Sequence, residues 1–342
     1  MSCPTHANGR NVGQPCDPAA PMQAISAILN PDTVGRGSGE EKVLISQSLE
    51  NRTVGLDSIS FKDKNVNEQK DGKDGVVGYY ANPAKFVPTL RPGSKLISTV
   101  FNDIVHVYGI HEQTGRISQF SPVFSHVTKE KGTPVEFNNI AACSNPKDDG
   151  KGYLYFQMKD TDGQYWIHEI NLSIPGSSPS QVEGTSEATK GTDIIAFHDG
   201  RARWILYQKT NPGRGGGSKE IILRNVEDEE QHRSMPGSSG CFSESLQLAR
   251  IAVANARTPA NQDDQVFVYV IGQKNRIYRS YATITKGMPE FEAFKPLAQA
   301  TYVNDYTSMS VVADPANEEN LIFAMPEKGD GISLQRDPWG KQ

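Results

Sequence analysis

The sequence predicts an all-β protein folded as a six-bladed β-propeller. A unit of about 50 residues recurs six times, and each copy holds three short segments with the two-residue alternation of β-strands. Turn-forming pairs such as Asp162-Gly163 separate these segments, and no long stretch shows helical periodicity. A repeat of this kind is typical of a propeller blade, because a single blade cannot bury its faces and stacking closes a ring.

The third strand of each copy carries an aliphatic anchor that sets the repeat length. These anchors lie between 50 and 63 residues apart and are Val54, Ile117, Ile167, Ile222, Ile277 and Ile332. Two separate β-sandwiches, the alternative architecture, would not space such residues evenly through the middle of the chain. We therefore expect one propeller over residues 24–342, with blades near residues 24–80, 94–125, 136–175, 191–228, 246–286 and 304–339.

Each copy orders its strands in the same way. The first strand is small and apolar, the second alternates aromatic residues, and the third carries Ile or Val. In the third copy these strands are expected at residues 139–142, 153–157 and 166–169. Small residues suit the crowded inner wall of a ring, so the first strands are expected to line the centre.

The first 23 residues form an expected N-terminal arm that precedes the blades. Cys3 and Cys16 bracket a stretch rich in Gly, Pro and Asn, which a disulfide between them would tie. Cys143 and Cys241 either pair with each other or stay free. Asn51 and Asn171 each begin an Asn-x-Ser/Thr acceptor sequence for glycans, and together with the cysteines they favour a secreted protein.

Composition and spacing exclude several classes of function. The chain has 35 Lys and Arg against 40 Asp and Glu, a net charge of −5, and no basic cluster, which argues against a nucleic-acid partner. No apolar run is long enough to span a bilayer, so no membrane partner is expected. No His/Cys spacing suggests zinc and no glycine-rich loop precedes a phosphate-binding Lys, so neither a metal nor a cofactor is expected.

Two segments of the third copy carry a resemblance to a known family. Tyr153-Leu-Tyr-Phe-Gln157, followed by Ile167-His-Glu169, resembles a blade of the fungal fucose-specific lectins, which are six-bladed propellers, and the resemblance spans about residues 24–339. In that family a strand-two Arg and a strand-three Glu of one blade, with an aromatic residue of a neighbour, hold each fucose. The resemblance implies that the corresponding positions of this chain are candidate sugar sites.

Most of these positions have lost the residues of the family. The Arg positions hold His106, Tyr153, Trp204, Phe267 and Leu321, and the Glu positions hold Gln119, Glu169, Arg224, Arg279 and Leu334. No copy keeps the Arg/Glu pair, so the resemblance implies a retained fold and a lost repeated sugar function. A fucose-binding or glycan-binding lectin with degenerate sites is the alternative.

By elimination, the chain also resembles the secreted fungal hetero-Diels-Alderases of tropolone-sesquiterpenoid biosynthesis, which look like degenerate lectin propellers. That resemblance implies a cofactor-free cycloaddition between a tropolone quinone methide and a humulene-type sesquiterpene, with apolar small molecules as partners. An inert structural or defence propeller is a third hypothesis, and the sequence leaves a homodimer open.

The cycloaddition hypothesis assigns roles to residues at the former sugar positions. His106 and Tyr153 are the expected hydrogen-bond donors and Trp204 the expected stacking platform, with packing between blades as the alternative role. The expected substrate-binding residues lie on third strands, in one turn and at the start of the last blade; they are Glu169, His198, Arg224, Arg279, Tyr302 and Tyr306. Arg224 and Arg279 would suit an anionic tropolonate or carboxylate.

Overall fold

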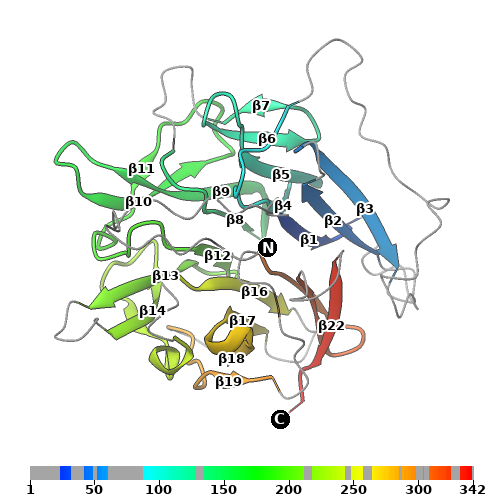
Figure 1. The fold of residues 1–342 in the computed structure, drawn as a ribbon, viewed down its shortest axis with the longest axis vertical. Coiled ribbons are helices and arrows are strands. Elements are labelled where there is room, and N and C mark those ends of the chain that lie inside the picture. The colour runs from blue at the N-terminus through cyan, green and yellow to red at the C-terminus, as the bar shows by residue number, and fades with distance from the viewer. Residues whose placement is uncertain are drawn as a thin grey trace, which may run out of the picture.

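The protein is a six-bladed β-propeller, as the sequence predicts (Figure 1). The computed structural model describes residues 24–31, 42–48, 52–60, 88–127, 135–145, 147–211, 218–242, 248–256, 264–284, 287–297, 303, 308–324 and 332–340. Six antiparallel sheets, each made from one continuous part of the chain, surround a common centre. The expected arm with Cys3 and Cys16, the acceptor Asn51, and Tyr302 and Tyr306 lie outside the described residues.

Each sheet is one blade, and its strands follow one another outward from the centre in chain order. Blade 1 is formed by β1 (Ile25–Leu29), β2 (Lys42–Ser48) and β3 (Val54–Ser60). Blade 2 is formed by β4 (Ile97–Phe101), β5 (Ile104–Ile110), β6 (Ile117–Ser121) and β7 (Ser125–His126). Blade 3 is formed by β8 (Ile140–Asn145), β9 (Asp148–Lys159), β10 (Tyr165–Asn171) and β11 (Ser180–Gln181). Blade 4 is formed by β12 (Ile194–His198), β13 (Arg203–Asn211), β14 (Ser218–Asn225) and β15 (His232–Ser234). Blade 5 is formed by β16 (Arg250–Ala256), β17 (Gln265–Ile271), β18 (Ile277–Thr283) and β19 (Lys295–Pro296). Blade 6 is formed by β20 (Ser310–Asp314), β21 (Glu319–Ala324) and β22 (Ser333–Pro338).

Two short 3-10 helices, η2 (Ser238–Cys241) and η3 (Gln273–Asn275), interrupt the loops of blades 4 and 5. In the part of the chain that the structure describes, no helix has the length and apolar character needed to cross a membrane.

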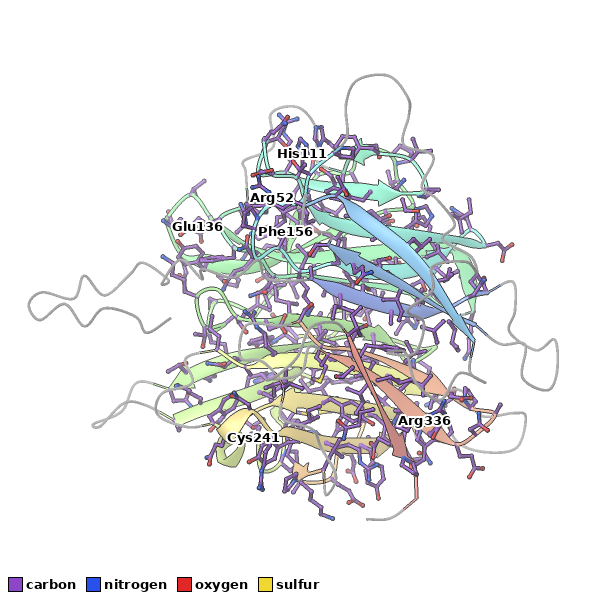
Figure 2. The ribbon with its side chains drawn as sticks, turned by 45° about the vertical axis from the view of Figure 1, so that its right-hand side comes forward. Arg52, His111, Glu136, Phe156, Cys241 and Arg336 are labelled. Atoms are coloured by element: carbon purple, nitrogen blue, oxygen red, sulfur yellow. The ribbon has the colours of Figure 1, made fainter. Side chains whose placement is uncertain are left out.

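The hydrophobic core is divided into six clusters, and each cluster fills the space between two neighbouring blades. Alternation along a strand explains this division, because successive side chains point to opposite faces of a sheet. On β13, for example, Tyr207 packs toward blade 3 whereas Trp204 and Leu206 pack toward blade 5. Phe156 of β9 belongs to the layer between blades 2 and 3 (Figure 2).

Blades 1 and 6 close the ring through apolar packing and two serine contacts. Ile25 and Ala27 of β1 pack with Val312 and Phe323 of blade 6. The backbone N–H groups of Ile25 and Ala27 donate to the hydroxyls of Ser308 and Ser310, each at 2.8 Å. These serines satisfy amides on the inner edge of β1 that no strand of its own blade reaches.

The two described cysteines are both free and buried, which settles the alternative that the sequence left open. Cys143 lies on β8 and Cys241 ends η2. Burial raises the pKa of each thiol to about 12. Both groups therefore stay protonated at neutral pH and fill apolar space.

Candidate functional site

The strand register identifies equivalent positions in five of the blades. Neighbouring residues on the second and third strands face the next blade as the cross-strand pairs Tyr108/Gln119, Tyr155/Glu169, Leu206/Leu223, Tyr269/Arg279 and Phe323/Leu334. The register corrects one part of the sequence alignment. Arg224 pairs with Ile205, so Leu223 rather than Arg224 occupies the position of blade 4 that is equivalent to Glu169. The alignment was wrong by one residue because Ile221, Ile222 and Leu223 are consecutive aliphatic residues, so polar and apolar side chains do not alternate there.

His106 lies between blades 2 and 3, where its ring contacts Phe101 and Gln119. It stacks on Phe101 with ring centroids 4.0 Å apart, and its Nδ1 lies 3.0 Å from Oε1 of Gln119. The Gln119 amide donates to the Val123 carbonyl, which directs the Gln119 oxygen toward the imidazole. His106 is 9% exposed and does not line the central cavity.

Tyr153 and Glu169 meet a residue of the next blade that the sequence did not single out. The guanidinium of Arg203 on β13 lies 4.0 Å from the centroid of the Tyr153 ring. Its Nη1 donates to Glu169 and its Nε to Glu227, each at 2.5 Å. Burial opposes the charge of Arg203, but Tyr155, Glu227 and Glu169 together raise its pKa above the ordinary value. An Arg/Glu pair is thus present, with its two members on blades 3 and 4, and the two side chains form an ion pair with each other.

A second cluster of this kind lies between blades 5 and 6. Nη1 of Arg279 donates to both carboxylate oxygens of Asp337 at 2.9 Å, and the Tyr269 hydroxyl donates to the same carboxylate at 2.6 Å. Two aromatic rings lie near the guanidinium: its carbon is 6.0 Å from the centroid of the Phe267 ring and 5.8 Å from that of Tyr281. Phe267 in turn stacks on Trp339. The Trp339 indole N–H is buried and has no partner among the described residues.

Trp204 and Arg224 are core residues. Trp204 is 1% exposed, and its indole donates to Asp199 at 2.8 Å. Arg224 donates to the Tyr207 hydroxyl at 3.2 Å and approaches Gly184, which adopts a positive φ of 71°. A Cβ at Gly184 would lie 2.4 Å from the guanidinium, so the glycine leaves room for Arg224.

The predicted functional residues therefore do not form one site. His106, Tyr153, Trp204 and Arg279 lie in different blade interfaces. Side chains of the protein bond Nδ1 of His106, the Trp204 indole and the Arg279 guanidinium, whereas Nε2 of His106 is buried without a partner among the described residues. His198 is the exception among the described candidates, because it lines the central cavity. Its Nδ1 accepts the N–H of Gly200 at 2.9 Å.

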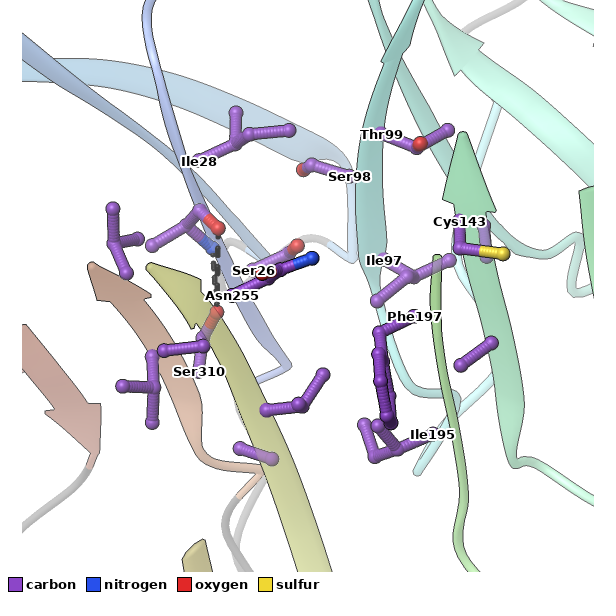
Figure 3. Close-up of a pocket in the computed structure, with 18 of the residues that line it drawn as sticks. Ser26, Ile28, Ile97, Ser98, Thr99, Cys143, Ile195, Phe197, Asn255 and Ser310 are labelled. Atoms are coloured by element: carbon purple, nitrogen blue, oxygen red, sulfur yellow. Dashed lines mark hydrogen bonds between the residues drawn. The ribbon is translucent and has the colours of Figure 1, made fainter. Parts of the chain in front are cut away.

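The central cavity has a volume of about 320 Å³, near the lower end of ligand-pocket sizes (Figure 3). All six inner strands contribute to its wall: β1, β4, β8, β12, β16 and β20. Aliphatic residues such as Ile28 and Ile97 supply most of the lining, and hydroxyl or amide groups of Ser26, Ser98 and Asn255 interrupt it.

Ser98 stands out among these polar groups. Its hydroxyl is buried and has no hydrogen-bond partner within the described part of the chain. By contrast, the Asn255 amide donates to the carbonyl of His198 at 2.8 Å. Sequence analysis missed Ser98, although the small residues expected on the inner wall were the signal that could have directed attention there.

Within the residues that the structure describes, no three His, Cys, Asp or Glu side chains come together in a geometry suited to a metal ion.

Comparisons with known proteins identify the fold. No protein-family profile matches the chain, and no curated protein is similar to it in sequence. The fucose-binding lectin of Aleuria aurantia, described as a six-bladed propeller, is 15% identical with a TM-score of 0.58, and the match covers 94% of this chain and 97% of the lectin.

Two further solved structures are similar to this chain over most of its length. AofleA from Arthrobotrys oligospora is 11% identical with a TM-score of 0.57, covering 93% of this chain and 84% of that protein. The BP39L lectin of Burkholderia pseudomallei is 9% identical with a TM-score of 0.56, covering 88% and 79%. The chain therefore has the six-bladed propeller fold found in fucose-specific lectins.

Proposed function

We propose that the protein binds a predominantly apolar small molecule in the central cavity and holds it against a second reactant. The corresponding reaction is the cofactor-free hetero-Diels-Alder cycloaddition of a tropolone quinone methide with a humulene-type sesquiterpene. The observation that carries this proposal is one aliphatic cavity walled by all six blades, whereas Arg203 and Arg279 at blade interfaces are bound to carboxylates of the protein.

Such a cycloaddition asks little of acid–base groups. One carbon–carbon and one carbon–oxygen bond form together, no proton is transferred and no electrons enter or leave the pair of reactants. Confinement in a near-attack geometry contributes most of the rate, and a hydrogen-bond donor to the heterodiene oxygen contributes the rest. An apolar wall with a few polar groups meets both requirements.

Ser98 is the donor that we assign. A buried hydroxyl without a partner is costly, and a ligand carbonyl in the cavity would accept its proton in a hydrogen bond. The contact would withdraw electron density from the heterodiene as the new bonds form. It would also orient that reactant relative to Ile28 and Ile97, which line the same cavity.

The test is incubation of the protein with a quinone-methide precursor and a humulene alcohol, followed by chiral chromatography of the adducts. We expect one stereoisomer above the spontaneous background, and a roughly tenfold slower reaction for Ser98→Ala because one hydrogen bond is lost. Ser46→Ala is the matched control, since Ser46 also has a buried hydroxyl without a described partner but lies on β2, outside the cavity wall. Racemic product at the background rate would refute the proposal.

A specific observation favours glycan binding as the second candidate. Arg203, Glu169 and Tyr153 combine a guanidinium, a carboxylate and an aromatic face at a blade interface, the groups that grip sugar hydroxyls and cover an apolar sugar face. Aleuria aurantia lectin has been solved with α-methyl-L-fucoside. Calorimetric titration with that fucoside tests this candidate: binding that Arg203→Gln abolishes would support it, and no heat would refute it.

We also propose a secretory route with a glycan at Asn171. Asn171 ends β10, and its side-chain oxygen accepts the N–H of Ser173 at 2.9 Å in a turn at the blade edge. A shift in electrophoretic mobility after glycosidase treatment, lost in Asn171→Gln, is the expected result.

A further inference from the structure

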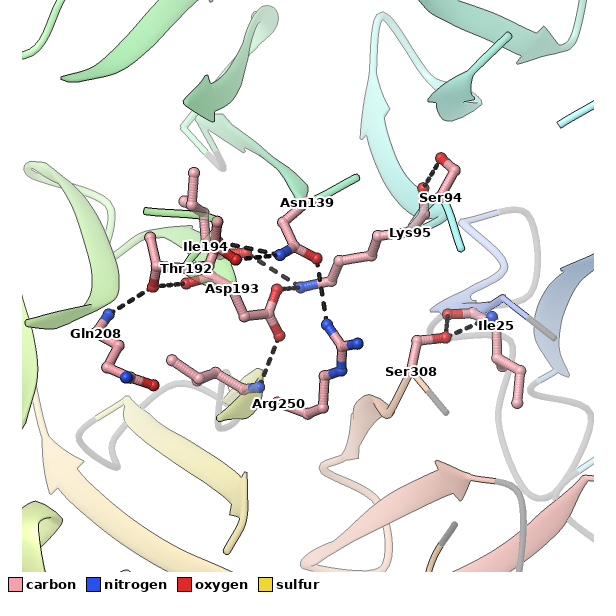
Figure 4. Close-up of polar contacts among 12 residues, drawn as sticks. Ile25, Ser94, Lys95, Asn139, Thr192, Asp193, Ile194, Gln208, Arg250 and Ser308 are labelled. Atoms are coloured by element: carbon pink, nitrogen blue, oxygen red, sulfur yellow. Dashed lines mark hydrogen bonds and ion pairs between the residues drawn. The ribbon is translucent and has the colours of Figure 1, made fainter. Parts of the chain in front are cut away.

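Four polar side chains meet where the inner strands begin, at one end of the central cavity (Figure 4). Lys95 precedes β4, Asn139 precedes β8, Asp193 precedes β12 and Arg250 begins β16. They come from blades 2, 3, 4 and 5 in that order, and we call them the mouth cluster. Lys95 also belongs to the cavity wall, so the mouth cluster is continuous with the apolar space described above.

Both oxygens of the single carboxylate of the mouth cluster accept a hydrogen bond. Nζ of Lys95 donates to Oδ1 of Asp193 at 2.7 Å, and the backbone N–H of Ile251 donates to Oδ2 at 2.8 Å. Nζ also donates to the carbonyl of Ile194 at 3.1 Å. Lys95 and Asp193 are 7% and 2% exposed, so this ion pair is shielded from water and fixed in place.

Arg250 has no comparable partner. Its guanidinium makes one long contact, 3.4 Å from Nη1 to Oδ1 of Asn139, and no carboxylate of the described residues forms an ion pair with it. The Asn139 amide is held by the carbonyls of Gly191 and Thr192, which turns its oxygen toward Arg250. The mouth cluster therefore contains two cations against one carboxylate, and Arg250 keeps most of its five N–H donors available.

The charge of Arg250 affects the ionisation of Lys95 within the mouth cluster. Burial lowers the pKa of Lys95 from its ordinary value; Asp193 opposes this shift and Arg250 adds to it. An anion bound at Arg250 would offset the repulsion between the two cations. A planar anion with two oxygens matches the guanidinium fork, which binds carboxylates through two parallel hydrogen bonds.

We propose that Arg250 binds the carboxylate of an amphipathic ligand whose apolar body fills the central cavity. This inference rests on the proposed use of the cavity for apolar molecules and adds the headgroup. The mouth cluster orients such a ligand, with its charged end among blades 2 to 5 and its hydrocarbon directed toward Ile28, Ile97 and Ser98.

The probes are decanoate, decan-1-ol and acetate, titrated calorimetrically into the whole protein. We expect decanoate to bind at least about tenfold more tightly than decan-1-ol, because a charge-assisted hydrogen bond contributes that much, and acetate to bind too weakly to detect. Arg250→Gln keeps a polar side chain beside Asn139 but removes the charge. It is expected to lose the preference for decanoate while decan-1-ol binds as before.

Arg52→Gln is the matched control, since Arg52 is a half-exposed guanidinium paired with Glu112 and is not part of the cavity wall. Unchanged decanoate affinity in Arg250→Gln would overturn the carboxylate site. Equal affinity of the wild-type protein for decanoate and decan-1-ol would overturn the site but leave the apolar cavity as proposed. Binding of neither probe would overturn both, and unchanged circular dichroism of Arg250→Gln would exclude misfolding as the reason for a loss.

Discussion

The interface between blades 5 and 6 contains a buried ion pair. Arg279 and Asp337 are 7% and 2% exposed, and each depends on the other for its charge. Arg279→Met is expected to destabilise the protein by about 3 to 5 kcal/mol, because it leaves Asp337 buried without a cation. The double variant Arg279→Met/Asp337→Leu is expected to recover most of that loss.

Urea unfolding followed by circular dichroism measures these free energies. The matched comparison is Lys295→Met, which removes one member of an exposed pair with Glu292 and is expected to change little. A double variant as unstable as Arg279→Met would show that the pair stabilises the interface beyond mutual neutralisation.

His168 predicts a pH dependence of stability. It lies on β10, 6% exposed, stacked near Phe156, and neither ring nitrogen has a partner among the described residues. Burial lowers the pKa of His168 from its ordinary value of 6.5, and Asp160 opposes the shift weakly. The unfolded chain therefore binds a proton more readily than the folded one. The stability contributed by the neutral ring is complete above that unfolded value and declines as the pH falls through it, until the folded imidazole also titrates.

His168→Phe should accordingly lose less stability than the wild-type protein between about pH 8 and about pH 5. The measurement is the difference in the urea midpoint between the two proteins at each pH. His111 and His126, whose pKa values burial also lowers, are present in both proteins and cancel in that difference. Parallel pH profiles would contradict the assignment.

At the scale of the strand, the closure of the ring depends on β1 and its contacts with blade 6. Ser308→Ala together with Ser310→Ala leaves the N–H groups of Ile25 and Ala27 without their hydroxyl acceptors. We expect the double variant to be less stable by about 1 to 3 kcal/mol, from two lost hydrogen bonds. Ser234→Ala is the control, since its hydroxyl bonds Glu220 on the surface and is expected to contribute little. Equal urea midpoints for the closure variant and the control would contradict this role.

The strands also show what sequence reasoning can reach. Period-two alternation and turn residues predict the repeated strands because both act locally, and the third-strand anchors Ile167 and Ile277 are indeed buried between blades. The pairing of Arg203 with Glu169 could not be predicted, because its members come from different blades and their distance depends on how sheets stack. For Ser98 the sequence predicts a place on the inner wall, but it cannot show that the hydroxyl lacks a hydrogen-bond partner in the fold.

For the whole molecule, the division of the core implies cooperative unfolding. Every cluster joins side chains of two blades, so opening one blade exposes apolar surface on both of its neighbours. A closed ring has no terminal blade that can fray at the cost of one interface. Unfolding is therefore expected to be a single transition rather than a sequence of blade openings.

Tryptophans at two interfaces allow this expectation to be tested. Trp204 packs between blades 4 and 5, and Trp339 packs against the cluster between blades 5 and 6. In variants that keep one of these tryptophans, with the other two replaced by Phe, the fluorescence transition in urea should coincide with the circular-dichroism transition of the same variant. That comparison within one variant cancels any stability lost by the replacements. Fluorescence of the Trp339 variant changing at lower urea than its circular dichroism would mean that blade 6 separates first, and that the serine contacts with β1 do not couple it to the ring.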